Sequence, residues 1–168
     1  MTTNDFLLHH THRLRGESMT TTVTILVGVP GSGKSHHTAS LTGAVVVSAD
    51  HYFVELGGGT YAFDPTKLGA AHGQCLRRYT EALQRGEAHV VVDNTNTTSL
   101  EMAPYVSLAL AYGYAVTIVR VTCDPAVAAA RNTHGVPEGA IRAMHARIES
   151  MMDAGFPPFW GVVVREVV

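Results

Sequence analysis

One octapeptide near the start of the chain has glycines, a lysine and a serine at a spacing that can hold phosphate groups. It follows the apolar run 23–27, matches G-x-x-x-x-G-K-[ST] at every fixed position, and consists of Gly28, Val29, Pro30, Gly31, Ser32, Gly33, Lys34 and Ser35. Glycines allow successive backbone N–H groups to turn toward an anion, where a Cβ would block the approach. Lys34 can then reach the β- and γ-phosphates, and the Ser35 hydroxyl can bind Mg²⁺. We therefore expect this segment to bind a nucleoside triphosphate.

Two aspartates follow apolar runs of the strand type and stand where a nucleotide site needs carboxylates. Asp50 follows the run 44–47, and Asp93 follows the run 89–92. Phosphoryl transfer requires a carboxylate near the attacking hydroxyl and oxygen ligands for Mg²⁺. We expect Asp50 to act as the general base and Asp93 to share the metal with Ser35. The residues expected to bind the acceptor are Asp50, Asn94, Thr95 and Asn96, although these residues also fit ordinary turns.

The polar segment 131–137 separates two expected helices late in the chain. We expect Arg131, at its start, to act as a lid residue that binds the nucleotide and stabilises the charge of the transition state. His134 and Arg142 follow closely and can support the phosphates or the acceptor, whereas Arg147 is expected on a solvated helix face. A solvated helix end is the alternative interpretation of Arg131 and His134.

Aromatic and basic residues surround the helix expected after the second strand. They are Tyr61, Phe63, His72, Arg77 and Arg78. Such residues beside an acceptor site can hold a phosphodiester backbone and stack a base. Together with Arg131 and Arg142, the two arginines would then form an arginine-lined face whose affinity for nucleic acid falls steeply with salt. Core aromatics and a polar helix face explain the same residues equally well.

Apolar strand-like runs alternate with helical segments along the rest of the chain. The expected strands cover residues 23–27, 44–47, 89–92, 114–121 and 161–168, and the expected helices cover 34–41, 64–85, 99–111, a segment from 124, and 138–152. This alternation indicates a parallel sheet covered on both faces. We expect an α/β fold of the P-loop NTPase type, a three-layer sandwich with a central, mostly parallel five-stranded sheet and a short helical lid. Right-handed crossovers would bring the loops that carry the octapeptide and both aspartates to one edge.

Length and composition indicate one soluble globular domain. The chain has 168 residues, 46% of them hydrophobic, and a net charge of −2, which excludes a strongly basic nucleic-acid binder. Cys75 and Cys123 are too few for a disulfide scaffold, so we expect reduced, buried thiols and a cytoplasmic location. We expect no membrane span. Residues 1–18 lack an apolar period and are expected to be a disordered extension before a domain over residues 19–168.

Taken together, these motifs resemble the P-loop kinase domain of polynucleotide 5′-kinases, especially the branch found in Nedd4-binding proteins and in bacterial and phage relatives. The resemblance runs from residue 23 to about residue 152 and rests on the segments 28–35, 48–53, 71–72, 92–96 and 131–137. It implies ATP- and Mg²⁺-dependent phosphorylation of a 5′-hydroxyl on DNA or RNA. Asp50 matches the general base of that family. Lys34 and Ser35 match its phosphate and metal ligands, and Arg131 lies in its lid.

The sequence departs from the phage polynucleotide kinase pattern at two positions. Phe53 stands where that pattern has an arginine that grips the acceptor phosphate, and Asn94 stands where it has an aspartate. The lid is also shorter and lacks a second arginine. These departures keep two other acceptors open, a hydroxymethylated pyrimidine in DNA and a small metabolite. A nucleotide-binding module without catalysis is a further alternative, and Asp50 argues against it.

Overall fold

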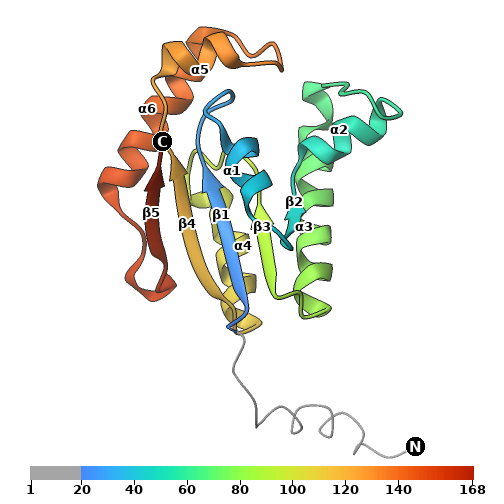
Figure 1. The fold of residues 1–168 in the computed structure, drawn as a ribbon, viewed down its shortest axis with the longest axis vertical. Coiled ribbons are helices and arrows are strands. Elements are labelled where there is room, and N and C mark those ends of the chain that lie inside the picture. The colour runs from blue at the N-terminus through green and yellow to red at the C-terminus, as the bar shows by residue number, and fades with distance from the viewer. Residues whose placement is uncertain (1–19) are drawn as a thin grey trace, which may run out of the picture.

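A five-stranded sheet lies at the centre of the chain, with its strands in the order β2-β3-β1-β4-β5 (Figure 1). In this computed structural model, which describes residues 20–168, the strands are β1 (Thr22–Val27), β2 (Val45–Val47), β3 (His89–Val92), β4 (Ala115–Val121) and β5 (Val163–Val167). Every neighbouring pair is parallel, which confirms the expected α/β sheet. The extension expected over residues 1–18 lies outside the described residues.

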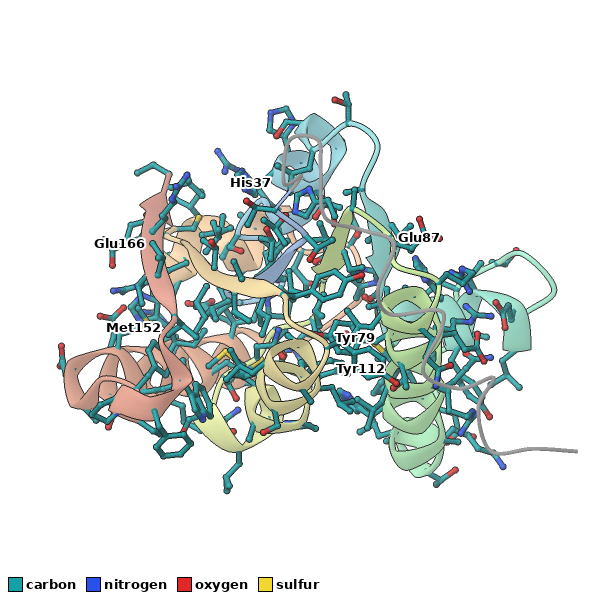
Figure 2. All side chains as sticks on the ribbon, turned by 90° about the horizontal axis from the view of Figure 1, so that it is seen from below. His37, Tyr79, Glu87, Tyr112, Met152 and Glu166 are labelled. Atoms are coloured by element: carbon teal, nitrogen blue, oxygen red, sulfur yellow. The ribbon has the colours of Figure 1, made fainter. Side chains whose placement is uncertain are left out.

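Helices cover both faces of the sheet, so the domain has three layers (Figure 2). Helix α1 (Lys34–Ser40), which carries His37, lies on one face. The other face is covered by α3 (Leu68–Gln84), which carries Tyr79, and by α4 (Ser99–Ala111) and α6 (Glu138–Ala154). Two shorter helices, α2 (Asp50–Leu56) and α5 (Pro125–Arg131), lie at the carboxyl ends of the strands, and 3-10 turns form at Pro65–Lys67 and Pro158–Trp160. None of the helices in this described part of the chain combines the length and apolar character that a bilayer crossing requires.

The central strand β1 is apolar on both sides because it contributes to two cores. Val23, Ile25 and Val27 are fully buried in the larger core, which also takes in side chains of α3, α4 and α6. Leu26 belongs to a smaller core on the opposite face, where it is joined by Val91 of β3. Side chains alternate between the faces of a strand, so a strand covered on both faces favours apolar residues at most positions, and the buried hydroxyl of Thr24 in β1 is hydrogen-bonded to His89. This preference explains the continuous apolar runs in the sequence.

Aspartate followed by proline starts two helical segments, as the sequence predicts. Asp64 Oδ1 accepts a hydrogen bond from the backbone N–H of Thr66 at 2.9 Å, and Asp124 Oδ1 accepts one from the N–H of Ala126 at 2.7 Å. Such caps satisfy N–H groups that have no partner within the first turn, where the missing N–H of proline costs nothing. The first of these segments begins with the 3-10 turn and continues as α3.

Helix α2 is an element that the sequence analysis missed. It begins at Asp50, three residues after β2 ends at Val47, whereas the next helix was expected only from residue 64. Its aromatic and β-branched residues have low helix propensity, which hides the helix in a sequence pattern. Phe53 is only 1% exposed, so burial of this ring in the main core stabilises the helix against its propensity. Asp50 is therefore the first residue of a helix.

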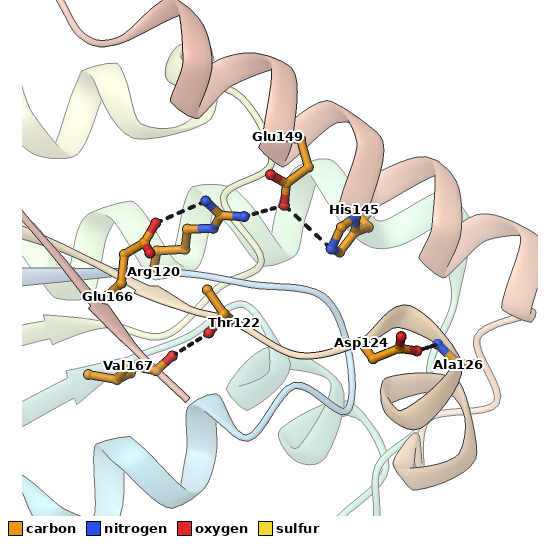
Figure 3. Close-up of polar contacts among 8 residues, drawn as sticks. All are labelled: Arg120, Thr122, Asp124, Ala126, His145, Glu149, Glu166 and Val167. Carbon is orange, nitrogen blue, oxygen red and sulfur yellow. Dashed lines mark hydrogen bonds and ion pairs between the residues drawn. The ribbon is translucent and has the colours of Figure 1, made fainter.

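An ion-pair network fastens the last strand and the last helix to β4 (Figure 3). The Arg120 guanidinium binds Glu149 of α6 and lies 2.9 Å from Glu166 of β5. His145 Nε2 lies 3.4 Å from the same Glu149 carboxylate, and the Thr122 hydroxyl donates a hydrogen bond to the Val167 carbonyl at 2.9 Å. The side chain of Arg120 is 17% exposed, so these pairs are less screened by water than surface pairs. The network fixes the edge strand β5.

Candidate functional site

Four chain segments meet in one cleft at the carboxyl end of the sheet. They are the loop between β1 and α1, the start of α2, the loop after β3, and the segment between α5 and α6. The cleft has a volume of about 690 Å³. The residues singled out from the sequence that line it are Pro30, Gly31, Gly33, Lys34, Ser35, Asp50, Tyr61, Asp93, Asn94, Thr95, Arg131 and His134. The fold therefore brings the glycine-rich loop, both aspartates and Arg131 together.

The glycine-rich loop has a backbone that only glycine adopts readily. Gly31 and Gly33 have φ values of 79° and 104°, in the left-handed region. A Cβ on Gly31 would lie 2.1 Å from the carbonyl oxygen of Ala128, so the loop packs directly against α5. Ser32 Oγ is buried and has no hydrogen-bond partner among the described residues. A tightly turned backbone with an unpaired hydroxyl fits a cradle for a phosphate group.

Lys34 and Asp93 carry opposite charges that burial disfavours. Lys34 Nζ donates hydrogen bonds to the carbonyls of Gly28 and Val29, at 2.8 and 3.0 Å. Burial lowers the pKa of Lys34, and the Asp93 carboxylate opposes that shift. Burial also raises the pKa of Asp93, which the Thr38 hydroxyl opposes by donating a hydrogen bond to Oδ2 at 2.9 Å. Each of the two charged side chains thus favours the charged form of the other.

Asp50 is an exposed carboxylate held by a neighbouring tyrosine. The Tyr61 hydroxyl donates a hydrogen bond to Asp50 Oδ1 at 3.1 Å. Burial and the negative charge of Asp50 raise the pKa of Tyr61, so the phenol keeps its proton. The Tyr61 ring also lies 4.5 Å, between centroids, from the ring of His134 in the segment between α5 and α6. Tyr61 therefore links the aspartate to the opposite side of the cleft.

Two of the expected acceptor-binding residues use their side chains inside the protein. Asn94 Oδ1 accepts a hydrogen bond from the Ala49 N–H at 2.9 Å, and its Nδ2 donates to Cys75 Sγ at 3.6 Å. Asn96 Nδ2 donates to the Leu26 carbonyl at 2.7 Å, and Asn96 is not among the residues that line the cleft. Both side chains support the loops around the cleft.

The arginine-lined face expected from the sequence is only partly assembled. Arg131 lines the cleft, but Arg78 pairs with Glu55 at 2.5 Å and Arg142 pairs with Glu138 at 2.6 Å. The remaining basic residues of the prediction are exposed on helices away from the lining, namely His72, Arg77 and Arg147. Two of the four arginines of the expected face thus already have carboxylate partners.

The sequence analysis overlooked two histidines that line the cleft. His36 follows Ser35 in α1, and His51 follows Asp50 in α2. Their places next to two predicted site residues were the available signal. A second oversight concerns Tyr61, which was noted for its aromatic ring and not for its hydrogen bond to Asp50. Sequence spacing could not reveal that contact, because it depends on the path of the loop after α2.

Comparison with known proteins identifies the family. A family model described as an AAA domain matches residues 23–158. The chain belongs to this family. Human NEDD4-binding protein 2 is 36% identical to it over 128 residues, a match that covers 71% of this chain and 7% of that protein. This AAA domain therefore corresponds to a small part of the curated relative.

Solved structures show the same fold. A chain of the Pnkp1/Rnl/Hen1 RNA repair complex matches this AAA domain with a TM-score of 0.69 at 18% identity, covering 84% of this chain and 48% of that chain. Shikimate kinase from Acinetobacter baumannii, solved with shikimate, matches with a TM-score of 0.50 at 20% identity, covering 81% and 80% of the two chains. The domain thus has the α/β P-loop fold of kinase structures, as the sequence predicts.

Replacing Gly31 by alanine tests the close packing of the glycine-rich loop. The matched control is Gly43→Ala, because Gly43 has a similar φ of 77° but no atom within 4 Å of the position that a Cβ would take. The free energy of unfolding of both variants should fall by about 1–2 kcal/mol, because an L-residue disfavours this backbone region. Gly31→Ala should lose more stability, because its Cβ would also collide with the Ala128 carbonyl. Chemical denaturation measures both losses, and equal losses would contradict this packing.

Proposed function

We propose that this AAA domain is a kinase that uses ATP and Mg²⁺ to phosphorylate the 5′-hydroxyl of a nucleic acid. The observation that carries the proposal is the convergence of the glycine-rich loop and the Asp50 carboxylate on one cleft. A loop that binds phosphate supplies the donor side, and a carboxylate at the same cleft supplies a base for a hydroxyl. A nucleotide-binding module without catalysis needs only the first of these.

The donor side of the cleft fits a magnesium nucleotide. Ser35 supplies a hydroxyl and Asp93 a carboxylate, and both are hard oxygen ligands of the kind that Mg²⁺ prefers. The hydrogen bond from Thr38 to Asp93 Oδ2 orients this carboxylate. When bound, Mg²⁺ would neutralise the negative charge of the phosphates. Lys34, with its ammonium group inside the loop, would add a second positive charge.

The acceptor side can then remove a proton from the attacking hydroxyl. Asp50 Oδ1 already accepts the Tyr61 hydrogen bond, so we assign Oδ2 to the hydroxyl proton. The hydroxyl oxygen forms a bond to the γ-phosphorus as the bond from that phosphorus to the β,γ-bridging oxygen breaks, and ADP leaves. Arg131, at the opposite side of the cleft, would stabilise the charge on the transferred group.

Structural likeness supports two classes of acceptor. The structural likeness to a chain of an RNA repair complex supports a nucleic acid. The weaker likeness to shikimate kinase supports a second candidate, a small metabolite with an alcohol group, as does the incomplete arginine face. A hydroxymethylated pyrimidine in DNA is the third acceptor to test. Labelled ATP with a panel of these three hydroxyl classes separates them directly.

Replacing Lys34 by alanine tests the phosphate-binding role of the loop. Loss of a preorganised positive charge at the transition state should lower kcat by about 10²–10³-fold. Lys67→Ala is the matched control, because Lys67 is the other lysine of the chain and lies outside the cleft lining. Labelled phosphate transfer measures both variants. Normal turnover of Lys34→Ala would remove the loop from the mechanism.

Replacing Asp50 by asparagine separates proton removal from nucleotide binding. Asparagine keeps the size of the side chain and an oxygen that can accept the Tyr61 hydrogen bond, but it is a poor base. We expect normal ATP affinity and a loss of about 10²–10⁴-fold in kcat. Asp64→Asn serves as the control, because Asp64 is a helix cap where asparagine is equally suitable. Weak ATP binding with normal turnover would assign Asp50 to the metal or to structure.

Salt dependence of the acceptor KM tests how the nucleic acid is held. Each phosphate contact to a single strand contributes about −0.7 to the slope of log affinity against log salt. Four arginines would give a slope of about −2.8. Since Arg78 and Arg142 are paired with glutamates, we expect two contacts and a slope of about −1.4. A slope of zero, with equal use of a sugar acceptor, would favour a metabolite kinase.

A further inference from the structure

Two aromatic side chains in the segment after α2 pack against the same buried ring. Tyr61 and Phe63 belong to the irregular segment between α2 and the 3-10 turn at Pro65–Lys67, and both rest on the buried ring of Phe53. The ring centroid of Phe53 lies 5.9 Å from that of Tyr61 and 5.1 Å from that of Phe63. We call Tyr61 and Phe63 the aromatic ledge. Because its supporting ring is fully packed, the ledge has a rigid base.

The ledge leads out of the cleft. Tyr61 lines the cleft and binds Asp50, whereas Phe63 is not among the lining residues and is 53% exposed. Exposure alone carries no argument, since single exposed apolar residues are common and Phe159 is 80% exposed at the other edge of the sheet. Phe63 differs because it packs on the same ring as Tyr61, which binds Asp50, and Asp50 is the aspartate proposed to face the acceptor. An acceptor longer than one nucleotide must continue from Asp50 past some part of the cleft rim.

Two of the acidic side chains beside the ledge already have partners. Glu55, two residues after Phe53, binds Arg78 at 2.5 Å and accepts a hydrogen bond from Gln74 at 3.0 Å. Asp64, next to Phe63, caps the following turn. The Arg78 guanidinium is thus engaged by Glu55, and Lys67 is a cation near Asp64 at this rim. Aromatic side chains, by contrast, bind unpaired bases of any sequence through stacking.

We propose that the aromatic ledge binds the bases of a single-stranded acceptor, with Phe63 stacking against the second nucleotide. This inference rests on the proposed function, because it takes the 5′-hydroxyl of the first nucleotide to lie at Asp50. Tyr61 then contacts the first nucleoside and Phe63 the next base along the strand. The acceptor class is accordingly a nucleic acid with at least two unpaired 5′-terminal nucleotides, recognised without a fixed sequence.

The test combines a ring deletion with a base deletion. Acceptor KM and kcat are measured at one salt concentration for the unmodified protein and Phe63→Ala, with a 5′-hydroxyl oligonucleotide that is intact or abasic at its second position. Removing a stacking ring should raise the KM of the intact strand at least about fivefold and leave kcat within about twofold. With the abasic strand, the two proteins should have the same KM, since neither can stack a base that is missing.

Three controls make the outcome specific. Phe159→Ala removes an exposed ring far from the cleft and should change neither constant. Phe63→Tyr keeps a ring and should retain the KM of the unmodified protein. An abasic site at the fifth position should leave the KM increase of Phe63→Ala intact. Thermal melting verifies that each variant is folded, which we expect because Phe63 is half exposed.

The possible failures differ from one another. If the unmodified protein phosphorylates no oligonucleotide, the proposed function fails and the ledge fails with it. If oligonucleotides are phosphorylated but Phe63→Ala has an unchanged KM, the ledge alone is wrong and the proposed function stands. An equal KM increase on the intact and abasic strands also overturns the ledge, because it would show an effect on the cleft instead of on a base.

Discussion

Backbone hydrogen bonds across the ends of parallel strands hold three of the four segments of the cleft together. The N–H of Gly28 donates to the Thr95 carbonyl at 3.1 Å, and the N–H of Asp93 donates to the Val47 carbonyl at 2.9 Å. These bonds continue the ladder of β2, β3 and β1 beyond the regular strands. The three loops therefore have little freedom relative to one another. The positions of the glycine-rich loop and of both aspartates follow from the pairing order of the sheet.

Side chains extend this backbone frame toward α2. Asn94 joins the Ala49 N–H to the buried thiol of Cys75, and the Tyr105 hydroxyl lies 3.4 Å from the same sulfur. Asp50 directly follows Ala49, so this chain of contacts fixes the start of its helix. An aspartate at position 94 could not donate to the sulfur as the amide does. Asparagine at this position is thus explained by support of the loop.

The sequence predicted the fold and the meeting of the glycine-rich loop with both aspartates, because both depend on local patterns. The octapeptide 28–35 has a fixed spacing, and the runs 23–27 and 89–92 are apolar because both faces of the sheet are covered. The surroundings of Asp50 were predicted less well. Their geometry depends on α2, whose residues have low helix propensity, and on the loop that brings Tyr61 back to Asp50. Such contacts arise from tertiary packing, which the hydrophobic periodicity of a sequence does not reveal.

The arginines illustrate the same limit for charge. A sequence shows which residues are basic but not which carboxylates neutralise them, and the partners of Arg78 and Arg120 are 23 and 29 residues away. The spacing of 46 residues between Arg120 and Glu166 is larger still. The expectation of an arginine-lined face therefore overestimated the positive charge available to a polyanion.

The ion-pair network of Arg120 also determines where the chain tolerates truncation or fusion. Arg120 and Glu149 line a small cavity together with Gly28 and Val29, so the network lies directly behind the glycine-rich loop. Truncation before Glu166 would leave Arg120 with one carboxylate partner fewer and remove the carbonyl that Thr122 binds. Expression boundaries and fusion junctions that cut into β5 would thus weaken the Arg120 network that packs against the glycine-rich loop. An affinity tag that follows β5 is better joined to the strand through a linker, so that the pairing of Glu166 and Val167 with β4 is kept.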